Sequence, residues 1–278
     1  MLAAFAMIST TIRSILKRTQ RLLGRSPTPY RFLRTVWTPS ERIYQHLQFT
    51  GEIEVPVARG ISFKIISHGN RVENDLFWRG YAKGWEAPSL ALWRDLAARS
   101  KCIVDVGSNT GVYALAAQAV NRAAKVMAVE PSRLTFRCLK ENIALNDFPI
   151  IAEEVAASDQ NGPVKFYDFP GSHQYSASLE EDFWPGAVPV EVEAVCLDTL
   201  FEKHGFKVDL LKMDVEGHEP AALRGMKKTL EAHRPTLILE ILTDEADRAV
   251  KKELDGLGYS ARRLGDRNVV FEASKYSS

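Results

Sequence analysis

The sequence predicts an α/β protein built around a doubly wound, mostly parallel sheet. Short apolar runs alternate with segments of helical periodicity along most of the chain. The strand candidates are almost continuously apolar, as in Thr236–Ile241, which is typical of strands covered by helices on both faces. Strands are expected at 102–106, 125–129, 150–155, 208–213 and 236–241. Helices are expected at 111–121, 132–145, 219–231 and 244–257.

The remaining segments suggest three regions. Residues 1–50 form a basic N-terminal extension, whose first 40 residues end in a proline-rich, turn-rich stretch. Residues 51–100 contain a hairpin, with alternating runs at 52–57 and 61–66, and a helix at 87–99 that packs on the core. Residues 101–278 form the main domain.

Two segments of the main domain depart from the alternation. Residues 160–200 lack helical periodicity and contain several Gly and Pro residues, so we expect an insertion with strand pieces at 163–168 and 190–195. Ligands of open α/β sheets bind beyond the carboxyl ends of the strands, where such an insertion would cover a substrate. Tyr259–Leu264 and Asn268–Phe271 predict an antiparallel C-terminal hairpin at the sheet edge.

Composition excludes several classes of protein. The chain has 278 residues and a net charge of +1, so its overall charge does not favour nucleic-acid binding. The cysteines Cys102, Cys138 and Cys196 lie far apart and form no Cys-x-x-Cys motif. This spacing argues against a disulfide framework or zinc site and favours a reducing compartment, so we expect a cytoplasmic location.

The first 40 residues are basic and contain no Asp or Glu. Apolar residues between Ile8 and Leu23 are spaced to form one face of a helix. A basic amphipathic helix binds anionic membrane surfaces, so residues 1–34 are a candidate peripheral membrane contact. The same composition also fits an organellar transit peptide or a solvated surface helix.

The strongest motif is a glycine turn after the first core strand. The turn reads Asp105-Val-Gly107-Ser-Asn-Thr-Gly111, and 19 positions later the next strand ends at Glu130. Glycine permits positive φ and close approach of the backbone to a ligand. A carboxylate at the next strand end accepts hydrogen bonds from ribose hydroxyls. The spacing differs from the Gly-x-Gly-x-x-Gly of pyrophosphate-binding turns, so the pattern predicts a nucleoside site.

A second group of polar residues follows the strand at 208–213. Asp214, Glu216 and His218 are crowded at its carboxyl end, where packing gives no reason for three titratable side chains. His218 is the first candidate for a general base because imidazole titrates near neutral pH, and Asp214 and Glu216 are the next. Asp214, Glu216 and Glu240 would alternatively suit magnesium, although the spacing does not require a metal.

Together these motifs resemble the FkbM-family methyltransferases over about residues 80–245. The resemblance rests on Asp105–Tyr113, Glu130-Pro131, Leu139-x-x-Asn142, Leu197–Leu200 and Lys212–Glu219. It implies a Rossmann-like class I methyltransferase fold and S-adenosylmethionine as the cofactor. It also implies O-methylation of a hydroxyl on a sugar, a glycan or a related hydroxylated metabolite.

The resemblance further implies roles for single residues. Asp214 would face the amino group of the cofactor or the reaction centre, and Glu86 would close over the cofactor or touch the substrate. The other expected cofactor contacts are Asp105, Gly107, Ser108, Asn109, Gly111, Tyr113, Glu130, Pro131, Ser132, Ala156, Ala157 and Ser158.

Candidate acceptor contacts lie mainly in the insertion. His173, Tyr175 and Trp184 are polar or aromatic residues that suit a sugar, and Glu240 is added from the last parallel strand. Two other functions fit part of the pattern. One is a nicotinamide-dependent oxidoreductase on a similar sheet, and the other is a non-catalytic family member that only binds the nucleoside.

Overall fold

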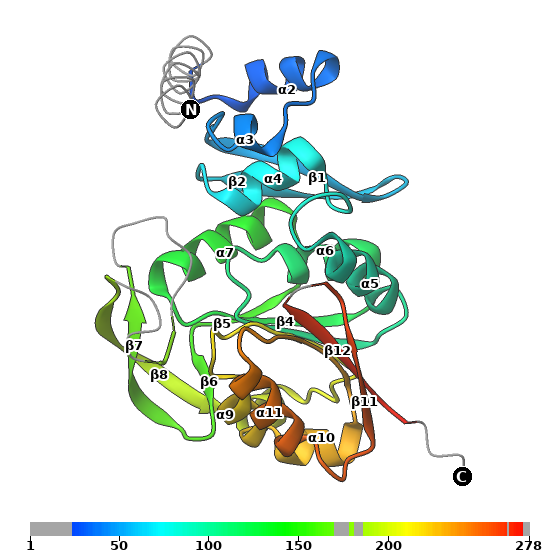
Figure 1. Cartoon of the computed structure of the whole chain (residues 1–278), viewed down its shortest axis with the longest axis vertical. Helices are drawn as coiled ribbons and strands as arrows, with labels where there is room; N and C mark the ends of the chain where they lie inside the picture. The colour runs from blue at the N-terminus through cyan, green and yellow to red at the C-terminus, as the bar shows by residue number, and fades with distance from the viewer. Residues whose placement is uncertain (1–23, 170–177, 181–185, 266, 275–278) are drawn as a thin grey trace, which may run out of the picture. The chain divides into compact units, whose positions relative to one another are not determined.

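The computed structural model describes residues 24–169, 178–180, 186–265 and 267–274 (Figure 1). Contacts between residues divide the chain into two compact units, residues 1–87 and 88–278. Each unit has its own secondary structure and its own buried side chains, so they are described separately.

The N-terminal unit contains the predicted hairpin. Strands β1 (Gly51–Ala58) and β2 (Ile61–Ser67) are antiparallel, and every second residue of β1 from Ile53 to Val57 is buried. Three helices in this unit were not predicted from the sequence, and α2 (Pro27–Val36) was missed because its proline-rich stretch was interpreted as turns. Proline is favoured in the first turn of a helix, where its missing N–H costs nothing. These helices are α2 (Pro27–Val36), α3 (Glu41–Tyr44) and α4 (Arg71–Arg79).

The larger unit is built on a seven-stranded sheet with the order β11-β12-β10-β9-β3-β4-β5. The strands from β10 to β5 are parallel, whereas β12 is antiparallel to both of its neighbours. This order confirms the predicted doubly wound, mostly parallel sheet with an antiparallel C-terminal hairpin. The strands are β3 (Cys102–Val106), β4 (Lys125–Val129), β5 (Ile151–Glu153), β9 (Leu210–Met213), β10 (Thr236–Glu240), β11 (Tyr259–Arg263) and β12 (Asn268–Ala273).

Helices cover both faces of this sheet (Figure 1). One face packs a continuous apolar core in which the strands contribute alternate residues, such as Val104 with Val106 and Leu237 with Leu239. Leu223, Leu230 and other helix residues complete this core. The helices are α5 (Ala87–Ala97), α6 (Val112–Val120), α7 (Arg133–Leu145), α8 (Leu197–His204), α9 (Glu219–Arg224), α10 (Lys227–His233) and α11 (Asp244–Glu253).

The predicted insertion forms a separate sheet of three strands. β7 (Gly162–Asp168) and β8 (Val188–Cys196) are antiparallel, and β6 (Ala156–Ser158) is parallel to β8. The predicted strand at 150–155 is present but shorter, because β5 ends at Glu153. β5 pairs with β4, and the chain then passes to the second sheet as β6. Helix α8, directly after β8, was not predicted.

The predicted helix at 219–231 is interrupted at Gly225 and Met226, giving α9 and α10. The Asp198 carboxylate accepts hydrogen bonds from the N–H groups of Lys228 and Thr229, at the start of α10. Asp198 also donates its own N–H to the carbonyl of Gly225. The break is therefore held by a residue of α8 that is distant in sequence, which local periodicity does not reveal.

Candidate active site

The glycine turn joins β3 to α6, and three of its residues have positive φ: Gly107, Asn109 and Gly111. A Cβ on Gly107 would lie 1.7 Å from the backbone oxygen of Asp214, and one on Gly111 would lie 2.6 Å from Leu139 Cδ1. At both positions a larger side chain would therefore clash with other protein atoms, whether or not a ligand is bound. Glycine is thus required for packing the turn against β9 and α7, in addition to any role toward a ligand.

Asp105 and Ser108 hold this turn from beneath. Asp105 is buried, and its carboxylate accepts a hydrogen bond from Ala114 N–H near the start of α6 (3.0 Å). The hydroxyl of Ser108 donates to the backbone oxygen of Asp105 and accepts from Val129 N–H. Burial raises the pKa of Asp105 to about 7 although the Lys212 ammonium opposes the shift. These two residues therefore shape the turn without lining the pocket above it.

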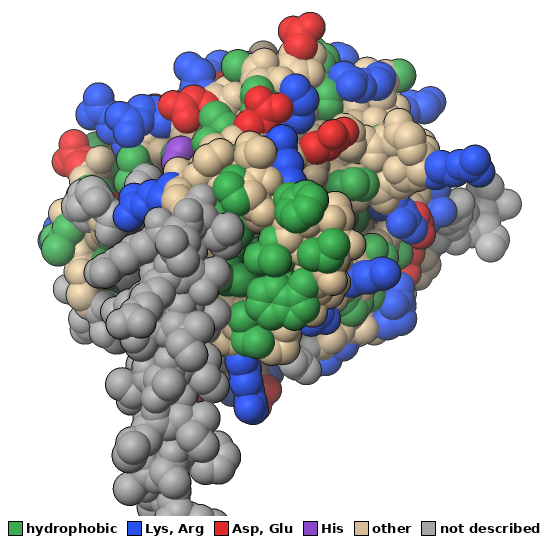
Figure 2. Space-filling view, turned by 90° about the horizontal axis from the view of Figure 1, so that it is seen from above, with side chains coloured by type: hydrophobic (Ala, Val, Ile, Leu, Met, Phe, Trp, Pro, Cys, Tyr) green, Lys and Arg blue, Asp and Glu red, His purple; other side chains and the backbone are tan. Residues whose placement is uncertain are grey.

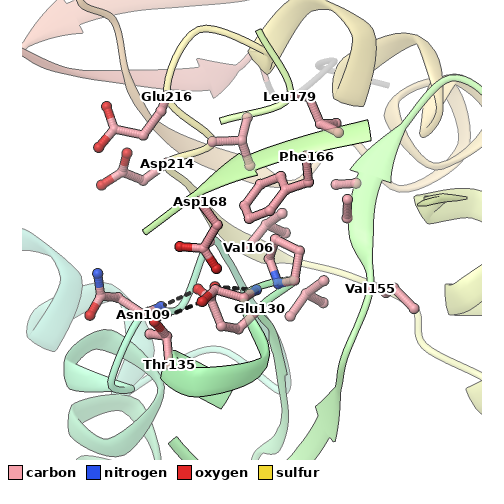
Figure 3. Close-up of a pocket in the computed structure, with 17 residues that line it drawn as sticks. Val106, Asn109, Glu130, Thr135, Val155, Phe166, Asp168, Leu179, Asp214 and Glu216 are labelled. Atoms are coloured by element: carbon pink, nitrogen blue, oxygen red, sulfur yellow. Dashed lines mark hydrogen bonds between the residues drawn. The ribbon is translucent and has the colours of Figure 1, made fainter. Parts of the chain in front are cut away.

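Glu130 follows β4 and lies at the bottom of the pocket (Figure 3). Its two carboxylate oxygens accept hydrogen bonds from the N–H groups of Asn109 and Ser132, both at 2.9 Å. Each oxygen keeps further lone pairs for a ligand. Burial raises the pKa of Glu130 to about 7, with a smaller contribution from the charge of Asp168.

Nine of the predicted residues line one pocket, with about 630 Å³ of empty space that is partly open to solvent. The other lining residues were not predicted, although Phe166 and Asp168 alternate on a predicted strand and Val106, Val129 and Val155 are the last residues of predicted strands. The predicted lining residues are Gly107, Asn109, Glu130, Pro131, Ser132, Ala156, Ala157, Asp214 and Glu216. Those that were missed are Val106, Val129, Thr135, Val155, Phe166, Asp168, Leu179 and Val215.

Asp214 and Glu216 lie at one end of this pocket, in the loop after β9 (Figure 3). Asp214 Oδ2 is 3.8 Å from the buried ammonium of Lys212, whereas Oδ1 is buried and receives no hydrogen bond from any described residue. A buried acceptor without a donor is costly and indicates a ligand group that is not part of the protein.

Glu216 has a φ of +52°, which is unusual for a residue other than glycine. The buried Glu219 holds this loop by accepting hydrogen bonds from the N–H groups of Val215 and Gly217. Burial raises the pKa of Glu216 to about 8, and the charges of Asp214 and Glu219 add to the shift. The strained backbone thus presents a carboxyl group that titrates near neutral pH at the edge of the pocket.

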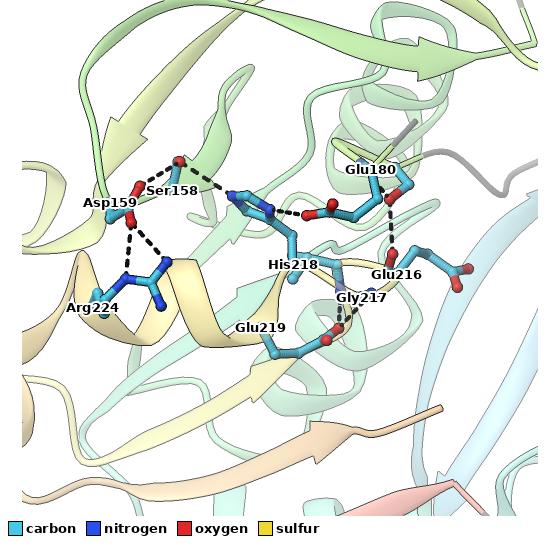
Figure 4. A network of polar contacts seen from close by, with 10 residues as sticks. Ser158, Asp159, Glu180, Glu216, Gly217, His218, Glu219 and Arg224 are labelled. Atoms are coloured by element: carbon cyan, nitrogen blue, oxygen red, sulfur yellow. Dashed lines mark hydrogen bonds and ion pairs between the residues drawn. The ribbon is translucent and has the colours of Figure 1, made fainter. Parts of the chain in front are cut away.

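His218 is not among the residues that line the pocket. Its Nε2 lies 3.2 Å from Ser158 Oγ and its Nδ1 lies 2.7 Å from Glu180 Oε1 (Figure 4). Ser178 adds a hydrogen bond from its hydroxyl to the carbonyl of Glu216 (2.8 Å). The contacts of His218 with Glu180 and of Ser178 with Glu216 therefore join the described part of the insertion to the loop after β9, and neither ring nitrogen of His218 is directed at the pocket.

The remaining predicted residues that the structure describes do not line the pocket, although Glu240 has a carboxylate oxygen within 4.8 Å of one from Asp214. The Tyr113 ring centroid lies 5.3 Å from Lys212 Nζ, and Glu240 Oε1 lies 3.7 Å from Arg267 Nη1. Glu86 belongs to the N-terminal unit and has a φ of +46°. Gly111 forms the start of α6. The predicted acceptor contacts His173, Tyr175 and Trp184 lie outside the described residues.

Comparison with known proteins decides the family. Residues 105–261, more than half of the chain, match the methyltransferase FkbM domain. The chain belongs to this methyltransferase family. The match starts at Asp105, before the glycine turn, and ends in β11, so it includes the whole pocket. The resemblance inferred from the motifs is confirmed, and the strand order agrees with the class I fold that the family implies.

Relatives of this FkbM-family protein include enzymes whose names specify an acceptor or the position that is methylated. The chain is 31% identical over 177 residues to the 2-O-methyltransferase NoeI of Sinorhizobium fredii, covering 56% of this chain and 72% of the relative. It is 29% identical over 160 residues to the hexuronic acid methyltransferase AglP of Haloferax volcanii, covering 56% and 62%.

Other matches are more partial. The methyltransferase sdnD of Sordaria araneosa is 29% identical over 154 residues, and the chain spans only 60% of its length. Among solved structures, an FkbM methyltransferase from Methylobacillus flagellatus is similar with a TM-score of 0.43 and 19% identity, over 62% of this chain and 43% of that one.

Proposed function

We propose that this protein is an S-adenosylmethionine-dependent O-methyltransferase acting on a hydroxyl of a sugar, a glycan or a related hydroxylated metabolite. The pocket at the carboxyl ends of β3, β4 and β9 carries this proposal. It combines the Glu130 carboxylate, an apolar wall and the unpaired Asp214 oxygen in one space. Two relatives support the acceptor class, because one is named a hexuronic acid methyltransferase and the other a 2-O-methyltransferase.

The lining residues match the parts of the cofactor in order along the pocket (Figure 3). Glu130 would accept a hydrogen bond from the ribose of the cofactor. Ala156, Ala157 and Val155 offer an apolar surface for the adenine ring. Asp214 Oδ1 would accept a hydrogen bond from the amino group of the methionine part, which supplies the donor that this oxygen lacks.

Chemically, the bound cofactor supplies an activated methyl group, and the protein must align an acceptor oxygen with it and exclude water. A hydroxyl acceptor also loses a proton during the transfer. Glu216 is the pocket residue best suited to take this proton, because its raised pKa of about 8 makes it a stronger base than an ordinary carboxylate. The ring contacts of His218 favour a positioning role for that residue.

A divalent cation is the less favoured expectation. Of the three carboxylates considered for magnesium, Asp214 and Glu216 line the pocket. Glu240 has a carboxylate oxygen within 4.8 Å of one from Asp214, but its Oε1 also lies 3.7 Å from Arg267 Nη1. A cation competes poorly for a carboxylate that already has a positive neighbour. Activity that survives treatment with a chelator would agree with a metal-independent reaction.

Calorimetric titration with S-adenosylhomocysteine tests the cofactor assignment. We expect micromolar binding to the wild-type protein and about 100-fold weaker binding to Glu130→Ala, because a hydrogen bond to a charged group is lost. Glu141→Ala, on the exposed surface of α7, is the matched control and is expected to bind normally.

The affinity for S-adenosylhomocysteine is expected to depend on pH, because the Glu130 carboxylate must be ionised. Ribose hydroxyls donate to the ionised carboxylate, so affinity is expected to fall as the pH decreases below about 7. Wild-type protein that binds a nicotinamide dinucleotide and not S-adenosylhomocysteine would contradict the proposal and favour the oxidoreductase alternative.

We also propose a peripheral contact with anionic lipid through the region around α2. Phe32, Val36 and Trp37 are exposed to 74%, 73% and 41%, and Arg31 is exposed beside them. Figure 2 shows apolar and basic side chains exposed side by side on one face of the molecule. Aromatic and basic side chains together favour the membrane interface.

None of the helices in the described residues is long and apolar enough to span a membrane.

Sedimentation with lipid vesicles checks this contact. The full chain is expected to sediment with vesicles that contain phosphatidylglycerol and to remain in solution with pure phosphatidylcholine. The double substitution Phe32→Ser and Trp37→Ser should weaken sedimentation severalfold, whereas Val188→Ser, which changes an exposed apolar residue of the other unit, should not. Equal sedimentation of both variants would argue against the contact.

A further inference from the structure

Strand β7 of the insertion forms a wall of the pocket, and this wall is not explained by the motifs of the main sheet. Phe166 and Asp168 are two residues apart, so their side chains leave the same face of the strand. Both are buried and both line the pocket together with Glu130. Figure 3 shows the Asp168 side chain extending from β7 toward Glu130.

The two carboxylates lie in a pocket without a positive partner. None of the described residues that line it is Lys, Arg or His. Glu130 receives two backbone hydrogen bonds, and Asp168 Oδ1 receives one from Phe169 N–H (2.7 Å). Each carboxylate still has free lone pairs. Two negative groups facing each other repel unless a donor lies between them.

The chemistry of a matching ligand follows from this arrangement. It must present hydrogen-bond donors in two directions and carry no negative charge at this point. A vicinal diol meets both conditions, because each hydroxyl donates one hydrogen bond. A phosphate at the same place would be repelled by both carboxylates, so the pair also discriminates against nucleotides that carry a 2′- or 3′-phosphate.

We propose that Asp168 is the second half of a ribose clamp, in which Glu130 accepts a hydrogen bond from one ribose hydroxyl and Asp168 accepts from the other. The inference rests on the proposed function, since it assigns a further contact to the same cofactor. Phe166, on the same face of β7, packs beside the adenine. The insertion thus completes the cofactor site itself, beyond its expected role as a cover for the acceptor.

The test uses S-adenosylhomocysteine and its 2′-deoxy and 3′-deoxy analogues as probes. Wild-type protein, Asp168→Ala, Glu130→Gln and the control Glu193→Ala, an exposed carboxylate of β8, are titrated with each probe. Asp168→Ala is expected to bind S-adenosylhomocysteine about tenfold more weakly or worse. One deoxy analogue lacks the hydroxyl that Asp168 contacts, so Asp168→Ala and wild-type protein should bind that analogue with equal affinity. Glu130→Gln and wild-type protein should bind the other analogue with equal affinity.

Several outcomes would overturn the clamp while leaving the proposed function intact. Normal binding by Asp168→Ala, with clear loss in Glu130→Gln, would show that Asp168 does not touch the cofactor. An equal loss of affinity for all three probes in Asp168→Ala would show that Asp168 has a structural role and does not contact a ribose hydroxyl. An effect that appears only with added magnesium would assign the pair to a cation. Absence of binding by wild-type protein would instead remove the proposed function and this inference together.

Discussion

Glu216→Gln is expected to lower kcat by about 10²- to 10⁴-fold, the usual contribution of a general base. Glutamine keeps the size of the side chain and removes its ability to accept a proton. The pocket would keep its shape, so S-adenosylhomocysteine should still bind within about threefold of the wild-type affinity. Methyl transfer to hexuronic acids that have a free 2-hydroxyl provides the assay, since one relative is named a hexuronic acid methyltransferase and another a 2-O-methyltransferase.

The pH profile gives this prediction a sign. Burial and two neighbouring carboxylates raise the pKa of Glu216 to about 8, and only the ionised form accepts a proton. Wild-type kcat is therefore expected to rise with pH and to level off above about 8. The Glu216→Gln variant should lack this rise, because the titrating group has been removed.

His218→Gln is the matched comparison, since His218 was the first candidate for the base. Both of its ring nitrogens lie within hydrogen-bond distance of Ser158 and Glu180, so its loss is expected to reduce kcat much less. A large decrease in His218→Gln with nearly normal activity in Glu216→Gln would assign the base to His218 and contradict the proposed role of Glu216.

Gly107→Ala is expected to be the most destabilising single substitution in the glycine turn. The new Cβ would lie 1.7 Å from the Asp214 carbonyl oxygen, and the φ of +72° is unfavourable for alanine. Overpacking against backbone adds to the conformational penalty, so the free energy of unfolding should fall by about 4 kcal/mol. Denaturation by urea measures the change.

Gly205→Ala separates the two contributions. Gly205 also has a positive φ, +64°, but no atom lies within 4 Å of the position its Cβ would take. It should lose only about 1 kcal/mol or slightly more, from the backbone conformation alone. Similar losses for both variants would mean that the contact between Gly107 and Asp214 has no energetic importance. Because that contact also positions Asp214, Gly107→Ala should weaken cofactor binding as well.

Much of the candidate site could be predicted because its residues follow strand ends. Glu130 and Asp214 come directly after apolar strands, and parallel strands bring their carboxyl ends to one edge of a sheet. The turn at Gly107 was visible from its spacing. The part of the pocket formed by the main sheet can therefore be predicted from local sequence.

The other part of the pocket depends on contacts that are distant in sequence. Phe166 and Asp168 lie on a predicted strand, yet only the pairing of β7 with β8 brings their face to the pocket. The pKa of Glu216 depends on its burial beside Asp214 and Glu219, and this burial cannot be predicted from the sequence. Likewise, the preference for His218 as a base rested on its intrinsic pKa, whereas its contacts with Ser158 and Glu180 come from the fold.

The sequence by itself determined the alternation of strands and helices, the family and the two strand ends that carry carboxylates. These features are encoded in periodicity and in short motifs, which act over a few residues. Only the tertiary structure decided where the helix after β9 is interrupted, because Asp198 of α8 caps α10 and a Cβ on Gly225 would lie 2.0 Å from the Ser158 carbonyl oxygen. Hydrogen bonds and steric contacts between distant segments have no local pattern, so they become visible only after the chain has folded.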